Sequence, residues 1–153
     1  MSESEHPYLS VIIPCWNEAA NLESGVLDEV YAYLSVQTYT WEVIIADDGS
    51  TDDSRELVRA YIADKPRMHL AELSHGGKPW AVWSGIQGAG GESVLFTDMD
   101  QSTPIAELAK LLPCYQADQN YDVVIGSRGL GRKGFSLLRK LRNRIFRDFR
   151  SLV

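Results

Sequence analysis

The sequence lacks the residues from which a disulfide framework or a zinc site is usually built. Its two cysteines, Cys15 and Cys114, lie far apart in the chain and form no C-x-x-C spacing, which excludes both kinds of scaffold. The three histidines, His6, His69 and His75, show no metal-ligand spacing either. We expect both cysteines to be inert thiols in or near the core. We assign the histidines no role beyond a position at the sheet edge for His75.

Long hydrophobic runs are missing as well. No stretch approaches the roughly 20 apolar residues of a membrane-spanning helix, and the first six residues are acidic where a signal peptide would be basic. The G-x-x-x-x-G-K-[ST] spacing of a P-loop is also absent, which disfavours an ATPase. We therefore expect a cytoplasmic protein with one globular domain, because 153 residues are too few for two full domains.

Charge is distributed unevenly along the chain. Residues 1–128 hold 7 Lys and Arg against 20 Asp and Glu, whereas residues 129–153 hold 8 Lys and Arg against the single Asp148. A basic segment that follows an acidic body indicates an anionic partner, such as a phosphate-bearing ligand or a lipid surface. We do not expect nucleic acid to be a partner.

Short apolar runs alternate with longer amphipathic stretches, which is typical of an α/β fold with a mostly parallel sheet. Strands are expected at 9–14, 42–46, 68–73, 93–97 and 121–126. Helices are expected at 18–35, from Ser50 or Thr51 to 63, at 81–89 and after Thr103-Pro104. In such a sheet ligands bind beyond the carboxyl ends of the strands. The polar turns after the first, second, fourth and fifth strands should therefore meet at one edge.

Two carboxylates, Asp98 and Asp100, follow the strand expected at 93–97. Mg²⁺ and Mn²⁺ accept one or two carboxylates and complete their coordination with substrate phosphates and water. Such a cation would stabilise the charge on a departing diphosphate. Taken alone, the same pair also fits two solvated acids ahead of the helix at Thr103-Pro104.

The other turns offer ligand contacts that have equally ordinary alternatives. Asp47 or Asp48 can accept a hydrogen bond from a nucleobase N–H, although Asp-Gly is also a common turn sequence. Gly77-Lys78 at a helix start offers backbone N–H groups and a cation to a phosphate. Arg128 can pair with a diphosphate through its planar guanidinium or simply be solvated.

The C-terminal segment, residues 135–153, reads as an amphipathic basic helix. Apolar residues at 137, 138, 141, 145, 146, 149 and 152 alternate with arginines and a lysine. A helix of this kind lies on anionic membranes or covers an acidic surface. The alternative is a helix that packs on the sheet and leaves its basic face in solvent.

Several motifs together resemble the family 2 glycosyltransferases of the GT-A fold. They are Val11-Ile12-Ile13-Pro14-Cys15-Trp16-Asn17-Glu18, Val43-Ile44-Ile45-Ala46-Asp47-Asp48-Gly49-Ser50-Thr51-Asp52, Gly76-Gly77-Lys78, Gly85-Ile86, Phe96-Thr97-Asp98-Met99-Asp100 and Val124-Ile125-Gly126-Ser127-Arg128. The resemblance covers nearly all of residues 8–150. It implies an α/β three-layer sandwich, with a nucleotide-sugar-binding domain at 8–128 and the basic helix at 129–153 as the start of an acceptor-facing or membrane-facing region.

Within that family the chain looks most like the polyprenyl-phosphate (dolichyl-phosphate) glucosyl- and mannosyltransferases. Ser102-Thr103-Pro104-Ile105 and Ile125-Gly126-Ser127-Arg128, followed by the basic segment, carry this likeness. The resemblance implies a nucleotide-sugar pocket made of Pro14, Trp16, Glu18, Asp47, Asp48, Lys78, Asp98 and Met99. It further implies Mg²⁺ or Mn²⁺ on Asp98 and Asp100, a catalytic role for these acids and Arg128, and the acceptor phosphate on Arg139 and Lys140. Residues 132–152 would contact the cytoplasmic membrane face peripherally.

The expected reaction is inverting, metal-dependent transfer of a hexose from UDP-glucose or GDP-mannose to a polyprenyl phosphate. A lipid phosphate is already anionic at pH 7, so the enzyme needs to align it and neutralise charge, without a general base. A family 2 transferase acting on a sugar hydroxyl in polysaccharide synthesis would need a catalytic carboxylate in the acceptor half. The only acid after Asp122 is Asp148, on the basic helix. The third interpretation is a truncated, non-catalytic nucleotide-sugar-binding remnant, completed by a partner chain or an oligomer.

Overall fold

The computed structural model describes residues 6–116 and 121–126. Contacts divide the chain into two compact units, residues 1–109 and residues 110–153. The sheet and the candidate site both belong to the first unit. The expected domain boundary at 128/129 lies outside the described residues and stays a prediction.

The first unit is built on a four-stranded parallel sheet with the order β3-β2-β1-β4. Its strands are β1 (Leu9–Cys15), β2 (Trp41–Asp47), β3 (Met68–Glu72) and β4 (Ser93–Phe96). The central pair β1 and β2 is buried along nearly its whole length. Parallel strands covered on both faces read as continuous apolar runs, which is why their positions were predicted to within one or two residues.

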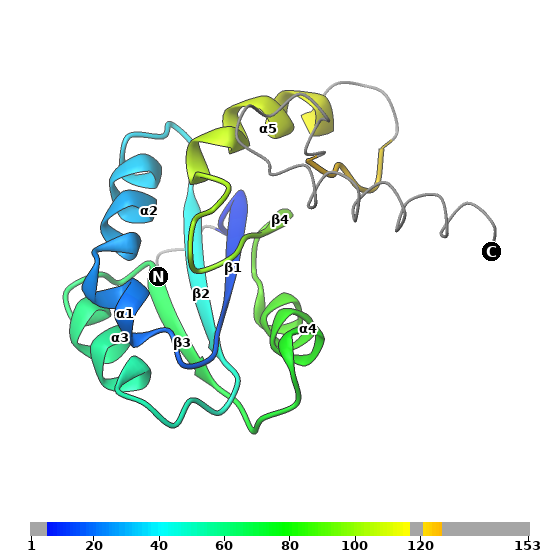
Figure 1. The fold of residues 1–153 in the computed structure, drawn as a ribbon. Coiled ribbons are helices and arrows are strands. Elements are labelled where there is room, and N and C mark those ends of the chain that lie inside the picture. The colour runs from blue at the N-terminus through cyan, green and yellow to red at the C-terminus, as the bar shows by residue number, and fades with distance from the viewer. Residues whose placement is uncertain (1–5, 117–120, 127–153) are drawn as a thin grey trace, which may run out of the picture. The chain divides into compact units, whose positions relative to one another are not determined.

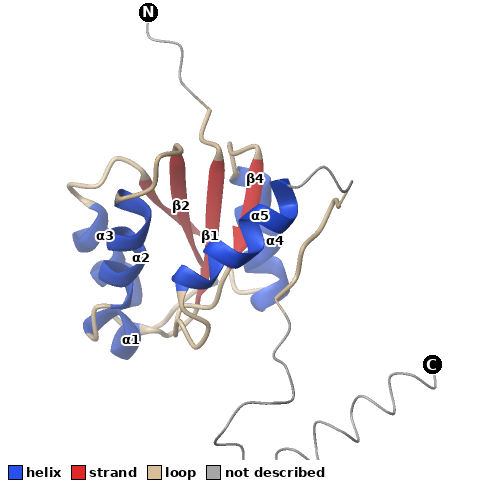
Figure 2. Cartoon of the chain, turned by 90° about the horizontal axis from the view of Figure 1, so that it is seen from above, coloured by secondary structure: helices blue, strands red, loops and turns tan. Residues whose placement is uncertain are grey.

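Helices cover both faces of this sheet. They are α1 (Ala19–Glu23), α2 (Val26–Ser35), α3 (Ser54–Ile62) and α4 (Lys78–Gly88). The 3₁₀ helix η1 (Ile105–Glu107) comes next in the chain, and α5 (Leu108–Gln116) then leads into the second unit. In Figure 1, α1, α2 and α3 lie on one side of the strands and α4 lies on the other. Figure 2 shows the same layers turned by 90°. The three-layer α/β class expected from the sequence is confirmed.

The approach of α4 to the sheet depends on Gly85. A Cβ atom at this position would lie 2.4 Å from Cγ2 of Ile12 and 3.6 Å from Cβ of Ala46. The absence of a side chain lets the helix pack directly on β1 and β2. Because α4 is held there, its first residues reach the carboxyl ends of the strands, where the candidate site lies.

The single helix expected at 18–35 is two helices. Gly25 has φ +84°, in the left-handed region, and its N–H donates to the carbonyl of Leu22 at 3.1 Å. A glycine just beyond a helix end is a common stop signal. The apolar spacing continues across the break, from Leu22 to Val26, and therefore predicted one helix where the backbone makes a turn.

The caps expected for two later helices were also wrong. The third helix begins at Ser54, because Ser50 and Thr51 are used in contacts with the turn after β1. Thr103-Pro104 does not open an α-helix with proline in its first turn. Pro104 instead precedes the 3₁₀ turn of η1 as its N-cap residue, and no side-chain cap bond forms there.

The fifth strand expected at 121–126 does not form. The alternating side chains of Tyr121, Val123 and Ile125 are all exposed. Alternation of this kind becomes a strand only where another strand supplies its hydrogen bonds, and none does so among the described residues. Cys114 is likewise exposed, contrary to expectation, whereas Cys15 is buried as expected.

Candidate active site

The candidate site is a cavity of about 470 Å³ at the carboxyl ends of β1, β2 and β4. It is lined by Pro14, Cys15, Trp16, Glu18, Asp48, His75, Gly77, Lys78, Ala81, Asp98, Met99 and Asp100. Its volume is in the range of pockets that hold small organic ligands. Three of the four polar turns expected at one edge of the sheet therefore meet, and the fourth, Ser127-Arg128, lies outside the described residues.

The turn after β1 is fixed by bonds to the turn after β2. The Oγ atoms of Ser50 and Ser54 accept the backbone N–H groups of Asn17 and Glu18 at 2.9 and 2.8 Å. Asn17 has φ +55°, and its side-chain oxygen accepts the Thr51 N–H at 2.8 Å. These bonds join segments more than thirty residues apart in the chain. They leave the neighbouring Trp16 half exposed at the cavity.

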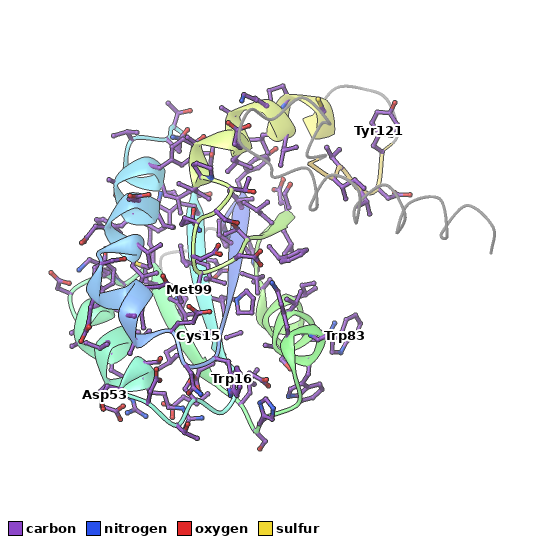
Figure 3. All side chains as sticks on the ribbon, in the orientation of Figure 1. Cys15, Trp16, Asp53, Trp83, Met99 and Tyr121 are labelled. Atoms are coloured by element: carbon purple, nitrogen blue, oxygen red, sulfur yellow. The ribbon has the colours of Figure 1, made fainter. Side chains whose placement is uncertain are left out.

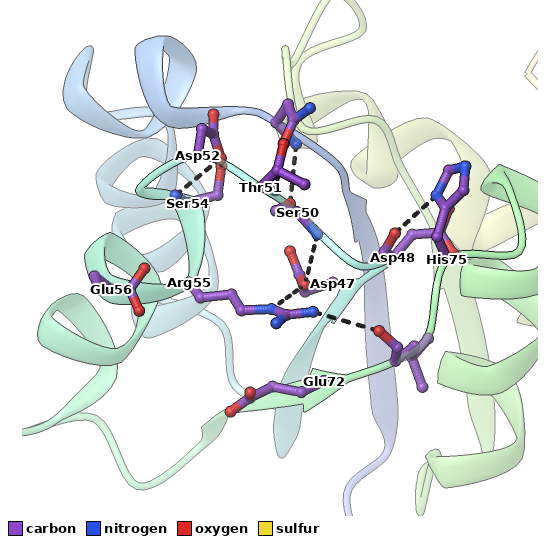
Figure 4. A network of polar contacts seen from close by, with 12 residues as sticks. Asp47, Asp48, Ser50, Thr51, Asp52, Ser54, Arg55, Glu56, Glu72 and His75 are labelled. Atoms are coloured by element: carbon purple, nitrogen blue, oxygen red, sulfur yellow. Dashed lines mark hydrogen bonds and ion pairs between the residues drawn. The ribbon is translucent and has the colours of Figure 1, made fainter.

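Asp47 and Asp48 face different surroundings, as Figure 4 shows. Asp47 is fully buried, and its Oδ1 accepts Nε of Arg55 at 2.5 Å and the backbone N–H of Ser50 at 3.1 Å. Asp47 is the last residue of β2 and does not line the cavity. Asp48 does line it. Both acids were predicted in the nucleotide pocket, and only Asp48 lines the cavity.

The Asp48 carboxylate holds the loop before α4 in place. Its Oδ1 and Oδ2 atoms accept the backbone N–H groups of Gly76 and Gly77, each at 2.8 Å. Gly49, the next residue, packs closely against the same loop, because a Cβ at Gly49 would lie 2.9 Å from the backbone nitrogen of His75. Asp48 is 2 % exposed, and these hydrogen bonds stabilise its buried charge.

His75 connects Asp48 with Trp16. Its Nδ1 atom lies 2.9 Å from Oδ2 of Asp48 and 2.9 Å from the Asp48 carbonyl oxygen. The imidazole also stacks on the Trp16 indole, with ring centroids 5.3 Å apart and planes inclined by 29°. Trp16 lies beside the loop in Figure 3. The carboxylate and carbonyl oxygens of Asp48 are both acceptors, so Nδ1 is the ring nitrogen of His75 that donates.

Asp98 and Asp100 follow β4 and Asp48 follows β2, the two strands on either side of β1, and all three acids line the cavity. Lys78, the first residue of α4, forms an ion pair with Asp98. Oδ1 of Asp100 accepts the Ser102 N–H at 2.9 Å, and the Gln101 side chain donates to the Asp98 carbonyl at 2.9 Å. These local bonds hold a tight turn in which Gln101 has φ +45°.

The acids at this turn fit a hard cation whose shell is completed by its ligand. Among the described residues, no group of three or more histidine, cysteine, aspartate or glutamate side chains gathers where a metal ion could bind. Asp98 and Asp100 supply two carboxylates, and Asp98 already binds one positively charged group, the ammonium of Lys78. A divalent ion held here would take its remaining ligands from phosphate oxygens and water.

Cys15 is the one thiol in the cavity wall. Burial raises its pKa to about 12, and the negative charges of Asp47 and Glu18 add to this effect. The thiolate is the reactive form of cysteine. Cys15 therefore remains a neutral, apolar part of the wall, as its sequence context predicted.

Comparison with known proteins agrees with this architecture. The chain matches the family described as Glycosyl transferase family 2 over residues 10–152. The chain belongs to glycosyltransferase family 2. It is 34 % identical over 135 residues to a dolichyl-phosphate beta-glucosyltransferase from Trichomonas vaginalis, with 82 % of this chain and 42 % of the relative covered. This glycosyltransferase chain thus spans about two fifths of that relative's length.

Two further proteins are similar. The undecaprenyl-phosphate 4-deoxy-4-formamido-L-arabinose transferase of Yersinia pestis is 31 % identical over 140 residues, covering 90 % of this chain and 41 % of the relative. A mannosyltransferase from Pyrobaculum calidifontis, solved in complex with GDP-Man and Mn²⁺, superposes with a TM-score of 0.53 at 33 % identity. That alignment covers 63 % of this chain and 28 % of the solved one. The relatives' names thus refer to polyprenyl phosphates and nucleotide sugars.

Most of the predicted site residues of this family 2 chain line the one cavity. Pro14, Trp16, Glu18, Asp48, Lys78, Asp98, Met99 and Asp100 do so. Asp47 does not, and Arg128, Arg139 and Lys140 lie outside the described residues. The roles assigned to all of them stay predictions. Among the described residues, no helix is long and apolar enough to cross a membrane.

The sequence did not indicate Cys15 and Ala81 as cavity residues, and it gave His75 an edge position without any contact there. The position of His75 directly before Gly76-Gly77-Lys78 was the available signal, because Gly77-Lys78 was already expected to contact a phosphate. Nothing local in the sequence indicated that its imidazole would lie on Trp16. That contact joins residues far apart in the chain.

Proposed function

We propose that the chain is the donor-binding part of an inverting, metal-dependent glycosyltransferase that moves a hexose from a nucleoside-diphosphate sugar to a polyprenyl phosphate. The observation that carries the proposal is the joint position of Asp98, Asp100, Lys78, Trp16 and Asp48 around one cavity. A nucleobase stacks on an aromatic face, and a divalent cation binds carboxylates. A diphosphate pairs with a lysine. UDP-glucose and GDP-mannose are the donors we favour.

The proposed roles follow from these positions. Trp16 and Asp48 would receive the nucleobase, with Pro14, Glu18 and Met99 completing the pocket. Asp98 and Asp100 would hold Mg²⁺ or Mn²⁺, which when bound neutralises charge on the leaving diphosphate. Lys78 would add a second positive charge beside the diphosphate. Arg128, which lies outside the described residues, would also place a positive charge beside the diphosphate.

The acceptor side rests on chemistry and on the relatives. A lipid monophosphate is anionic at neutral pH and attacks the anomeric carbon without a general base, from the face opposite the diphosphate. This attack gives inversion. We propose that Arg139 and Lys140 receive that phosphate and that residues 132–152 bring the chain to the cytoplasmic membrane face peripherally. The names of two relatives, which refer to dolichyl and undecaprenyl phosphates, support this acceptor class.

The proposal is tested by a thermal-shift panel followed by a transfer assay. UDP-glucose, GDP-mannose, UDP-GlcNAc and the free diphosphates are added with and without Mn²⁺. A Mn²⁺-dependent rise in Tm with one donor is expected, because a ligand that binds only the folded chain stabilises it. The preferred donor is then incubated with a short-chain polyprenyl phosphate. Formation of the hexosyl polyprenyl phosphate supports the proposal.

Three outcomes would point elsewhere. Donor binding without transfer to the lipid would indicate a binding remnant that needs a partner chain for activity. Transfer to an oligosaccharide hydroxyl would indicate a polysaccharide synthase. No Tm shift with any nucleotide would contradict the donor site itself.

A further inference from the structure

The loop His75-Gly76-Gly77-Lys78 occupies both ends of the cavity with its own side chains. At one end the imidazole of His75 stacks on Trp16 and bonds to Asp48. At the other end the ammonium of Lys78 pairs with Asp98. Two residues only three positions apart therefore contact the aromatic face, the buried carboxylate and the acid of the proposed cation site.

The imidazole shows what the Trp16 and Asp48 surface accepts. It is a flat aromatic ring with one N–H group aimed at carboxylate and carbonyl oxygens 2.9 Å away. A nucleobase has the same two features, a π-face and an N–H edge. The side chain of His75 is 59 % exposed, so it can leave toward solvent.

The loop does not need the His75 side chain to stay in place. Asp48 holds its backbone through the N–H groups of Gly76 and Gly77, at 2.8 Å each. Gly49 packs against the backbone of His75. The imidazole can therefore rotate away while the start of α4 and the cavity wall remain fixed.

The ammonium of Lys78 occupies the place of a cation at Asp98, as the imidazole of His75 occupies the place of a base. A divalent ion bound at Asp98 would repel the ammonium group, because two positive charges would share one carboxylate. Both partners of this ion pair are about half exposed, so the pair is weak and exchangeable. Once displaced, Lys78 is left beside the cation and free to contact a diphosphate.

We infer that His75 and Lys78 are internal stand-ins for the base and the cation, and that donor binding displaces both from one loop. The inference rests on the proposed donor site and goes beyond it, because it makes base recognition and cation binding compete with the protein's own side chains. His75 is then a residue that sets nucleotide affinity by competition. Asp48 then keeps the loop in place through Gly76 and Gly77 and also accepts the N–H edge of the base that replaces His75.

Removing either stand-in should strengthen binding of the component it replaces. His75→Ala should bind UDP or GDP about 3-fold to 10-fold more tightly than the wild type without added metal, which is the size of an aromatic pair. Lys78→Met should bind Mn²⁺ up to about 5-fold more tightly without nucleotide. The same Lys78→Met protein should bind the diphosphate with Mn²⁺ more weakly, because the released ammonium is missing.

The measurements are calorimetry for the nucleotide and Mn²⁺ electron paramagnetic resonance for the cation. His69→Ala is the matched control for His75, since His69 lies on β3, is half exposed and does not line the cavity. Arg59→Met is the control for Lys78, since Arg59 is half exposed and pairs with Glu56 and Glu72 outside the cavity. Both controls should match the wild type in nucleotide and Mn²⁺ affinity.

A second readout uses the unmodified chain. Nitrogen-15 resonances of its three histidines should show the Nδ1 signal of His75 moving when nucleotide is added, because the bond to Asp48 is lost. The signals of His6 and His69 should not move. A nucleotide that binds without moving His75 overturns the inference, as does unchanged or weaker nucleotide binding by His75→Ala.

The two proposals fail in different ways. If the wild type binds nucleotide with Mn²⁺, but His75→Ala gains no nucleotide affinity or Lys78→Met gains no Mn²⁺ affinity, the stand-in inference is wrong and the donor site remains. If the wild type binds no nucleotide even with Mn²⁺, and His75→Ala binds none either, both are wrong. Nucleotide binding that appears only in His75→Ala supports the inference.

Discussion

Asp47 and Asp48 are neighbours in the chain, yet their carboxylates serve different parts of the structure. Asp47 accepts Nε of Arg55 from α3, whereas Asp48 accepts the N–H groups of Gly76 and Gly77 ahead of α4. β2 ends between them. The first acid therefore stabilises the protein body, and the second arranges the cavity.

This division predicts different consequences for the two substitutions. Asp47→Ala should lower Tm by several degrees, because it leaves the Ser50 N–H and the Arg55 guanidinium without their buried partner, while nucleotide affinity changes little. Asp48→Ala should weaken UDP or GDP binding, because the loop carrying Gly77 and Lys78 loses its anchor. Thermal unfolding and calorimetry separate the two effects. Equal loss of nucleotide affinity in both variants would refute the division.

A second prediction concerns the contact between α4 and the sheet. Gly85→Ala should destabilise the chain by about 1–3 kcal/mol, because the added methyl overlaps Ile12 and the helix must move. Gly88→Ala in the same helix is the matched control. A Cβ there meets nothing within 4 Å, and the substitution should leave stability unchanged or raise it by up to about 1 kcal/mol. Urea unfolding measures both, and equal effects would contradict the packing.

A third prediction distinguishes the two thiols. Burial, with the charges of Asp47 and Glu18, raises the pKa of Cys15 to about 12, so this thiol stays protonated and unreactive at pH 8. Cys114 is exposed. A disulfide-exchange reagent should modify one thiol per folded chain at pH 8 and two in denaturant. Cys114→Ser should remove the fast reaction, and fast modification of Cys15 would show that the cavity wall is open.

The strands and the cavity turns were predicted from the sequence because their signals are local. β1 and β2 are unbroken apolar runs that end in polar turns, and burial on both faces explains that pattern. In a parallel sheet the ends of such strands meet at one edge. Trp16, Asp48 and Asp98 were therefore expected together before the structure placed them around one cavity.

The parts that failed depend on contacts between distant segments. Ser50 was expected to cap α3, but its hydroxyl accepts the Asn17 N–H from the turn after β1. The strand expected at 121–126 has the right alternation and no partner among the described residues. The stack of His75 on Trp16 brings together two turns with no shared sequence signal. Local patterns do not contain this information.

The central claim is that Asp98 and Asp100 hold a divalent cation against a nucleotide diphosphate. Its most direct test is calorimetric titration of UDP and GDP, with and without Mn²⁺, into the wild type, Asp98→Asn and Asp100→Asn. We predict that Mn²⁺ strengthens diphosphate binding by the wild type at least tenfold, or by about 1.4 kcal/mol, and that either substitution removes most of this gain. An Mn²⁺-dependent gain that survives in both variants would contradict the account.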